Sequence, residues 1–254
     1  MTAWILLRGL TRESRHWGDF PALLGKAIPA AEIVSLDLPG NGRANGVPSP
    51  TSIPAMAEHC RRALAAGAIP PPYHLLAMSL GAMVAVAWAA SHPEELAGCV
   101  LINTSLRPFS PFYRRLRPRS YGTLLGLALP GRGVRRREEA IFDLTSTLAG
   151  RRERIVDDWV AWRREHPVSC ANAWRQFWAA SRYRAPAGRP AVPLLILAGG
   201  GDALVDPDCS RRLARAWRTD FAEHPGAGHD LPLDDGAWVA GQVRQWLGRK
   251  PVTP

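Results

Sequence analysis

A serine, an aspartate and a histidine stand in this chain at positions where successive strands are predicted to end. The segment 73–91 reads YHLLAMSLGAMVAVAWAAS, an apolar strand that runs through Ser79 directly into an apolar helix. Ala77 and Gly81, two residues before and after the serine, are small, as a sharp strand-to-helix turn requires. Such a turn exposes the serine hydroxyl above the sheet as a nucleophile. The alternative is that Ser79 only caps the helix N-terminus.

The order of the other two residues favours the nucleophile. Asp202 follows the strand predicted at Leu194–Ala198, and His229 lies in a glycine-rich loop after the last predicted strand. This order of serine, acid and histidine, with the acid and base on loops after later strands, is that of a Ser-Asp-His catalytic triad in an open α/β sheet. We therefore predict that His229 is the general base for Ser79 and that Asp202 orients the histidine. Asp206, one helical turn further on, is the alternative acid.

The elements that must position these residues alternate along the chain. Six short apolar runs have the length and flanking turns of strands, and the segments between them repeat apolar residues at helical spacing. Strict alternation of strand and helix favours an α/β fold, with a mostly parallel sheet of about six strands and helices on both faces. The predicted strands are Trp4–Leu7, Ile33–Leu36, His74–Met78, Cys99–Ile102, Leu194–Ala198 and Asp220–Glu223, and the predicted helices are 17–27, 53–66, 80–90, 209–217 and 238–247.

The alternation breaks once, between Cys99–Ile102 and Leu194–Ala198, where about 90 residues carry only helical patterns. No single loop between a strand and a helix has that length. We predict a helical cap at 106–189, inserted into a core formed by 1–105 and 190–254. Aromatic residues of the cap are expected to pack its helices together, and a minority to line a substrate pocket; the candidates for the pocket are Trp159, Trp174 and Trp178.

The positive charge is concentrated in the same segment. The 254 residues carry a net charge of +10, and 106–189 alone holds 18 arginines against seven carboxylates. The predicted core is therefore nearly neutral. Three interpretations are open: a solvated arginine-rich surface, attraction of an anionic substrate or anionic membrane surface, and nucleic-acid binding. We expect no nucleic-acid partner, because no recognised binding motif accompanies the basic patch.

The sequence lacks the motifs of several other classes of protein. The four cysteines, which do not have the spacing of a zinc site or redox dithiol, are expected to be free thiols. Neither a phosphate-binding glycine loop nor a dinucleotide motif occurs, so we expect no metal and no cofactor. The N-terminus lacks the features of a signal peptide, and no apolar run approaches the ~20 residues of a membrane span. We therefore expect a cytoplasmic protein without a transmembrane segment.

Beyond the three candidate residues, further segments give the chain a resemblance to the α/β-hydrolase superfamily over nearly its whole length. They read LLRGLT at 6–11 with Trp17 following, DLPGNG at 37–42, CVLINT at 99–104 and GHDLPL at 228–233. The resemblance implies a trimmed α/β-hydrolase fold with a helical cap, and an oxyanion hole made by the backbone N–H groups of Leu10 and Leu80. Arg8 and Asn41 depart from the histidines usual at these places. In the family, the histidine at the position of Arg8 is expected to brace the oxyanion loop. Here either the Arg8 guanidinium takes over that role or the loop lacks this brace.

The expected function is a serine hydrolase that cleaves small-molecule carboxylic esters with small to medium acyl chains through an acyl-enzyme. Two alternatives stay open. Hydrolysis of a carbon–carbon bond, or a lyase-type elimination, uses the same three residues in this fold. A weakly catalytic binding protein would instead dock an anionic partner on its basic cap. Haloalkane and epoxide hydrolysis are disfavoured because they require an aspartate at position 79.

Overall fold

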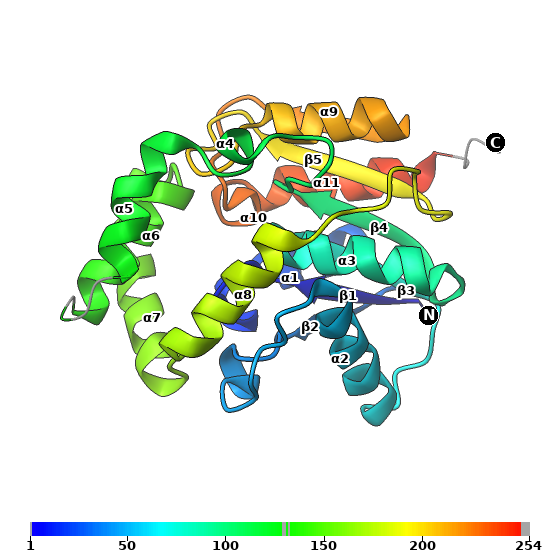
Figure 1. Ribbon diagram of the computed structural model, residues 1–254. Coiled ribbons are helices and arrows are strands. Elements are labelled where there is room, and N and C mark those ends of the chain that lie inside the picture. The colour runs from blue at the N-terminus through cyan, green and yellow to red at the C-terminus, as the bar shows by residue number, and fades with distance from the viewer. Residues whose placement is uncertain (1, 129–130, 132, 250–254) are drawn as a thin grey trace.

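Six parallel strands form the centre of the structure, a computed structural model that describes residues 2–128, 131 and 133–249 (Figure 1). Every pair of neighbouring strands is parallel, and the strand order is β2-β1-β3-β4-β5-β6. The carboxyl ends of all six strands therefore share one edge of the sheet, which confirms the predicted α/β class. The strands are β1 Ala3–Leu7, β2 Glu32–Leu36, β3 Tyr73–Met78, β4 Leu96–Ile102, β5 Leu194–Gly199 and β6 Asp220–His224.

Alternate side chains of each strand face two different helical layers. In β1, Ile5 and Leu7 pack on the side of α2 (Ile53–Ala66), α3 (Leu80–Ser91) and α9 (Asp208–Trp217). Trp4 and Leu6 pack on the side of α1 (Phe20–Ala27) and α11 (Gly236–Gly248). Because successive side chains of a strand point to opposite faces, a strand covered on both faces is apolar throughout. This explains the short, uninterrupted apolar runs of the sequence.

The helix predicted from residue 17 begins later than its apolar spacing indicates. Trp17 ends a short 3-10 helix, Ser14–Trp17, and α1 begins at Phe20. Gly18 between them has φ of 54°, a left-handed conformation that interrupts a right-handed helix. Trp17 nevertheless packs against Phe20, with ring centroids 5.5 Å apart, so the apolar contact survives the break.

The segment between β4 and β5 is helical and stands beside the carboxyl edge of the sheet (Figure 1). Two of its helices, α6 and α7, share a small apolar core around Phe142, Val156 and Trp159. The division of the chain into core and cap units stays a prediction. Met1 and residues 250–254 of the predicted core, and residues 129, 130 and 132 of the predicted cap, lie outside the described residues. The whole segment between β4 and β5 is called the cap below. Its helices are α4 Phe112–Arg115, α5 Tyr121–Ala128, α6 Val134–Thr145, α7 Arg152–Glu165 and α8 Cys170–Arg182.

The cysteines are free thiols, three buried and Cys170 exposed. Burial raises the pKa of the Cys60 and Cys99 thiols to about 12, which makes both poor nucleophiles. Within the described ranges, no helix combines the length and apolar character that crossing a membrane demands.

Candidate active site

Ser79 stands at the turn from β3 into α3. Its backbone has φ of 55° and ψ of −114°, a conformation that residues other than glycine rarely adopt. The Ser79 N–H donates to the carbonyl of Ile102 at 2.9 Å, and the Ser79 carbonyl accepts from the N–H of Ala82 at 3.1 Å. These hydrogen bonds hold the strained turn in place. The result is the geometry of a nucleophile elbow, with a half-buried Ser79 side chain at its tip.

Glycines on two segments allow the loop after β1 to pass close to this elbow. A β-carbon at Gly81 would lie 2.7 Å from the carbonyl oxygen of Arg8, and a β-carbon at Gly9 would lie 3.3 Å from Cβ of Ser79. Leu80 begins α3 directly after Ser79, at a position where no helical carbonyl accepts its N–H. Leu10 follows Gly9 in the neighbouring loop. The two predicted oxyanion residues thus lie on the two segments that meet at Ser79.

Asp202 and His229 meet at the same edge of the sheet. Nδ1 of His229 lies 2.7 Å from Oδ2 of Asp202, and both side chains are buried. Oδ1 of Asp202 accepts the backbone N–H groups of Leu204 at 2.8 Å and Val205 at 2.9 Å. Both carboxylate oxygens therefore have partners, which fixes the orientation of the acid. Among the described residues, no hydrogen bond involves the Ser79 hydroxyl; in free enzymes the bond between nucleophile and base often forms only when substrate binds.

Asp206, the alternative acid, has other partners. Its Oδ1 accepts the backbone N–H of Asp208 at 3.0 Å, at the start of α9. Its other oxygen lies 3.7 Å from Nη1 of Arg114 in the cap. The structure therefore pairs His229 with Asp202 and directs Asp206 to a helix N-terminus and a cap arginine.

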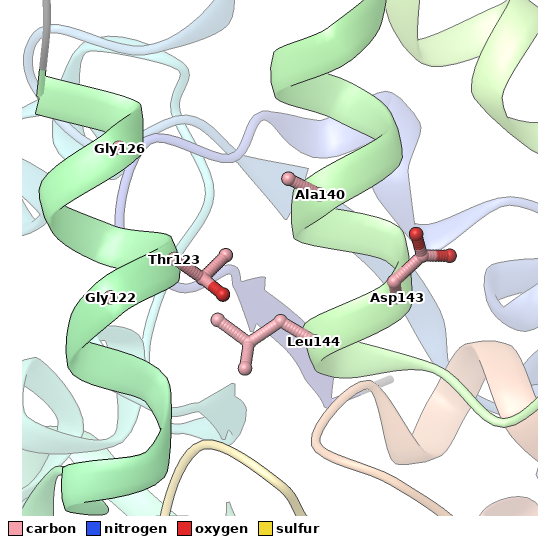
Figure 2. A pocket seen from close by; sticks show the side chains of 6 residues that line it. All are labelled: Gly122, Thr123, Gly126, Ala140, Asp143 and Leu144. Carbon is pink, nitrogen blue, oxygen red and sulfur yellow. The ribbon is translucent and has the colours of Figure 1, made fainter.

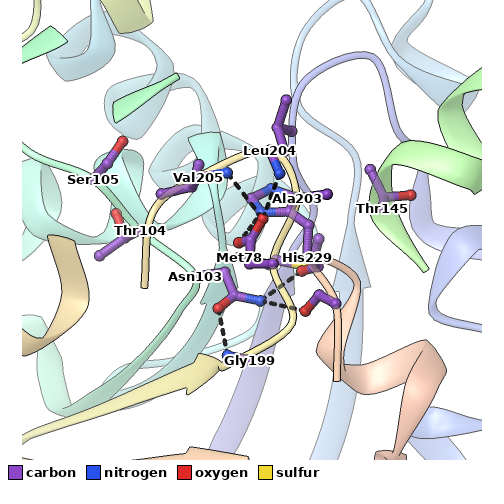
Figure 3. A network of polar contacts seen from close by, with 12 residues as sticks. Met78, Asn103, Thr104, Ser105, Thr145, Gly199, Ala203, Leu204, Val205 and His229 are labelled. Atoms are coloured by element: carbon purple, nitrogen blue, oxygen red, sulfur yellow. Dashed lines mark hydrogen bonds and ion pairs between the residues drawn. The ribbon is translucent and has the colours of Figure 1, made fainter. Parts of the chain in front are cut away.

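Asn103 ties the acid and histidine loops to the sheet (Figure 3). It follows β4 with φ of 46°. Its side-chain oxygen accepts the Gly199 N–H at 2.8 Å, and its side-chain nitrogen donates to the carbonyls of Gly228 at 3.0 Å and His229 at 2.7 Å. The sequence did not reveal this role. A polar residue directly after a buried strand was the available indication.

Arg8 forms a buried ion pair with Asp230. Nη1 and Nη2 of Arg8 donate to the two oxygens of Asp230 at 2.9 Å and 2.6 Å, and the guanidinium lies 4.8 Å from the ring centroid of Trp17. Asp230 directly follows His229, so one bidentate pair joins the loop that contains Leu10 to the loop that contains His229. The guanidinium therefore braces the loop after β1, which answers the question raised by the departure at Arg8. Asp230 itself was not identified from the sequence.

The cap is bonded to the same loops. The carbonyl of Thr145, the last residue of α6, accepts the backbone N–H of Asp230 at 2.7 Å. Nη1 of Arg117 donates to the backbone carbonyl of Asp202 at 2.7 Å. Arg117 of the cap therefore holds the loop that contains Asp202, and Thr145 of the cap holds the loop that contains His229. Figure 3 shows Thr145 on the same side as His229.

Helix α8 binds the loop after β1 through a buried glutamine. Oε1 of Gln176 accepts the backbone N–H of Thr11 at 2.8 Å. Nε2 of Gln176 donates to Oδ1 of Asn41 at 2.8 Å and to Oγ of Ser49 at 3.0 Å. Asn41, the second departure from the family pattern, thus takes a structural place between the cap and the core.

A buried charge cluster lies where α6 and α7 meet the core. Glu138 accepts from Arg12 at 2.6 Å and from Arg163 at 2.8 Å, and the Arg12 guanidinium lies 4.2 Å from the ring centroid of Trp159. Burial lowers the pKa of Arg12, and the charge of Glu138 opposes that shift. Burial alone would raise the pKa of Glu138, but the two arginine charges outweigh it and lower that pKa. The cluster connects cap and core through paired charges.

The three candidate pocket tryptophans lie in different surroundings. Trp159 is buried in the cap core, whereas Trp174 is 61% exposed and Trp178 is 50% exposed. Their assignment to a substrate pocket stays a prediction. A cleft of about 420 Å³ lies between α5 and α6 (Figure 2), and Ser79 and His229 are absent from its lining, which consists of Gly122, Thr123, Gly126, Ala140, Asp143 and Leu144.

Metal-binding side chains gather at one place in the described part of the chain, at His92, Glu94 and Glu95. The two oxygens of Glu95 already accept from Arg61 at 2.5 Å and 2.9 Å, and one of them also accepts from the indole of Trp88 at 2.8 Å. Because these partners occupy the carboxylate, we assign no metal to this group.

Fold and site together define an α/β sheet with a serine on a positive-φ turn where β3 passes into α3. The model of the Alpha/beta hydrolase family matches residues 4–242, so the chain belongs to this family, which confirms the resemblance in the sequence. No curated protein matches the chain.

Solved structures share this fold at low sequence identity. A thermophilic esterase from Thermogutta terrifontis is 20% identical, with a TM-score of 0.72 over 98% of this chain and 90% of that chain. The esterase RhEst1 from Rhodococcus sp. ECU1013 is 20% identical, with a TM-score of 0.76 over 97% and 90%. The enol-lactonase from Burkholderia xenovorans LB400 is 19% identical, with a TM-score of 0.76 over 98% and 92%. At these identities the likeness shows the fold.

Proposed function

We propose that this protein is a serine hydrolase that cleaves carboxylic esters with small to medium acyl chains. The observation that carries the proposal is the 2.7 Å hydrogen bond between Asp202 and His229, at the edge of the sheet where Ser79 occupies a positive-φ turn. The carboxylate holds the imidazole with its proton on Nδ1, which leaves Nε2 free to accept a proton. Solved structures with the same fold include two esterases and an enol-lactonase, and a lactone is a cyclic ester, which supports the choice of an ester bond.

The proposed reaction has two halves. Oγ of Ser79 attacks the ester carbonyl carbon while Nε2 of His229 takes the hydroxyl proton, and His229 then gives that proton to the departing alcohol. The carbonyl oxygen becomes negative in the transition state, where the N–H groups of Leu80 and Leu10 stabilise it; loss of one such donor typically costs about 10²–10³ in rate. Water hydrolyses the acyl-enzyme by the same proton transfers in reverse, and Ser79 is regenerated.

The first test replaces the nucleophile. We expect Ser79→Ala to remain folded, because the change removes only one half-buried hydroxyl oxygen that has no hydrogen bond among the described residues. The variant should lose measurable turnover of 4-nitrophenyl acetate and butyrate. A fluorophosphonate probe should label the wild type on Ser79 and leave the variant unlabelled. Retained turnover in Ser79→Ala would contradict the proposal, and so would an inert wild type, which would favour a binding protein.

The same assay separates the two candidate acids. Asp202→Asn should lower kcat by about 10⁴-fold, because an amide holds the imidazole in the wrong tautomer. Asp206→Asn is the matched control and should leave kcat within a few-fold of wild type. A larger loss in Asp206→Asn would move the acid to that position. A diketone substrate tested beside the esters distinguishes carbon–carbon bond hydrolysis.

A further inference from the structure

Helix α8 has two faces of opposite character. Its inner face packs on the core through Asn172, Gln176 and Ala179, which are buried. Its outer face carries Trp174 and Trp178, which are 61% and 50% exposed. Hydrogen bonds of Asn172 and Gln176 and the apolar packing of Ala179 hold the inner face against the core.

The aromatic side chains of the outer face form one continuous ridge. Trp174, Phe177 and Trp178 follow the i, i+3, i+4 spacing that places side chains next to one another on a helix. The rings of Trp174 and Phe177 meet edge to face with centroids 5.7 Å apart, and Phe177 is 43% exposed. A contiguous exposed apolar patch of this kind marks an interaction surface rather than scattered surface hydrophobicity.

The outer face of α8 also carries arginines whose charge no acidic side chain among the described residues neutralises. Arg175 and Arg182 are exposed on the ridge, and Arg184 is exposed just beyond it. The chain contains no Asp or Glu between Glu165 and Asp202. Within the described residues none of the three arginines forms a salt bridge, and the Arg182 guanidinium lies 5.2 Å from the ring centroid of Trp178.

Some arginines on other cap helices are paired with acidic side chains. Arg135 of α6 is paired with Asp157 and Glu139, and Arg152 of α7 is paired with Asp143 at 2.7 Å. Their charges are locally neutralised. On α7, Arg154 and Arg164 also form no salt bridge within the described residues, but α8 combines its unpaired arginines with exposed aromatic side chains.

We propose that the outer face of α8 docks on an anionic lipid bilayer. Tryptophan and phenylalanine side chains enter the interface between headgroups and acyl chains, and arginines beside them pair with anionic lipid headgroups. A second copy of the same face would bring like charges together, which opposes self-association. Single-stranded nucleic acids are held in positively charged grooves, whereas this surface is the ridge of one helix.

The docking face lies next to the candidate active site. Gln176, on the opposite side of α8, holds the Thr11 N–H in the loop after β1. Docking therefore places this loop about one helix diameter, ~10 Å, from the lipid surface. The docking proposal itself does not depend on the proposed hydrolase activity.

Co-sedimentation of the full chain with vesicles tests the proposal. We expect binding to phosphatidylcholine vesicles that contain phosphatidylglycerol, and little binding to pure phosphatidylcholine. The variant R175Q/R182Q should bind about 25-fold more weakly, because each arginine near an anionic surface contributes about fivefold. The variant W174S/F177S/W178S should also lose binding. Ser79→Ala should bind as wild type, so that failure of the hydrolase proposal and failure of docking are told apart.

Matched controls locate the effect. R151Q/R154Q removes two exposed arginines of the cap outside α8, and F112S/Y113S removes an exposed aromatic pair on α4. Both should bind as wild type, and thermal melts confirm that each variant is folded. Equal losses in R151Q/R154Q and R175Q/R182Q would overturn the assignment to α8. So would a wild-type dimer that W174S/F177S/W178S dissociates, or tighter binding to polyuridylate than to the anionic vesicles.

Discussion

Arg8 and Asp230 show how a buried charge in the loop after β1 requires an opposite charge from a distant part of the chain. A buried guanidinium needs a compensating charge, and the carboxylate of Asp230 meets it through two hydrogen bonds at 2.9 Å and 2.6 Å. The pair lies beside His229 in sequence and beside Leu10 in space. Its stability is therefore linked to the shape of the proposed active site.

Breaking the Arg8–Asp230 pair on one side should strongly destabilise the protein. We expect Asp230→Asn to lower the free energy of unfolding by about 3–5 kcal/mol, because it leaves the Arg8 charge buried and unpaired. The double variant Arg8→Met/Asp230→Leu should recover most of this loss, since both charges are removed together. Urea unfolding followed by circular dichroism measures all three proteins.

The control for this prediction is the exposed pair Arg249–Asp220. Its atoms lie 3.2 Å apart, with side chains 63% and 43% exposed. Removing that pair should change the free energy of unfolding by less than about 1 kcal/mol. Equal losses at the buried and exposed pairs would contradict the assigned role of Arg8.

The residues of the candidate site differ in how far the sequence reveals them. Ser79 is identifiable because its small neighbours and its strand-to-helix position are local in sequence. The Arg8–Asp230 pair spans 222 positions and Gln176 reaches Thr11 across 165, so nothing near either residue predicts its partner. Such contacts exist only once the sheet and cap are assembled.

At the level of elements, β3 leads into the candidate active site at one end and holds an aromatic stack near the other. His74 stacks on Trp4 of β1 with centroids 4.5 Å apart and planes 5° from parallel, and it meets the edge of Trp246 from α11. Burial among these rings lowers the pKa of His74 from 6.5 to about 4. The stack packs β1, β3 and α11 together with an imidazole that is neutral in the folded protein.

This stack predicts a loss of stability in acid. In the unfolded chain His74 takes up a proton below pH 6.5, whereas in the folded chain it does so only near pH 4. Stability is therefore complete above pH 6.5 and falls as the pH drops toward 4, by about 2–3 kcal/mol from this residue. His74→Phe keeps the stacking and removes the titration. The urea midpoint of the variant should match that of the wild type at pH 7.5 and exceed it at pH 5. If the midpoint fell equally in both proteins between pH 7.5 and pH 5, the assignment to His74 would be wrong.

The strands were predictable from the sequence to within a few residues, and the exceptions have physical causes. The prediction started β4 at Cys99, whereas the strand begins at Leu96: Leu96 pairs with Tyr73 and Gly98 pairs with His74, with a register shift between the two pairs that leaves Ala97 unpaired. Gly98 leaves room for the ring of Trp246, which would lie 2.7 Å from a β-carbon there. The packing of α11 thus accounts for a glycine in this strand, a residue that weakened the strand signal in the sequence.

For the whole molecule, the cap is bonded to both loops of the candidate site. Thr145 holds the Asp230 N–H, and Arg117 holds the Asp202 carbonyl. Local loss of the cap would therefore release these contacts even with the sheet intact. When two regions open together, the backbone amides of both exchange hydrogen faster, so exchange rates measure this coupling.

A cavity in the cap core tests this coupling. Val156→Ala removes two buried methyl groups between α6 and α7 and should destabilise the cap by about 1–3 kcal/mol. We expect faster hydrogen exchange, read by mass spectrometry, in peptides from both 134–165 and 225–235. Val239→Ala, on α11 against the sheet, is the matched control and should not accelerate exchange in 134–165 selectively. Faster exchange in 134–165 alone would contradict the coupling.

The strand order places β2 and β6 at the two edges of the sheet. In the part of the chain that the structure describes, β2 and β6 have partners on one side only, and each is five residues long. Unpaired edges are templates on which other chains add strands, and charged side chains on short edge strands discourage that addition. β2 begins with Glu32, and β6 carries Asp220 and Glu223. Both open edges thus bear negative charge, which protects an all-parallel sheet from growing into aggregates.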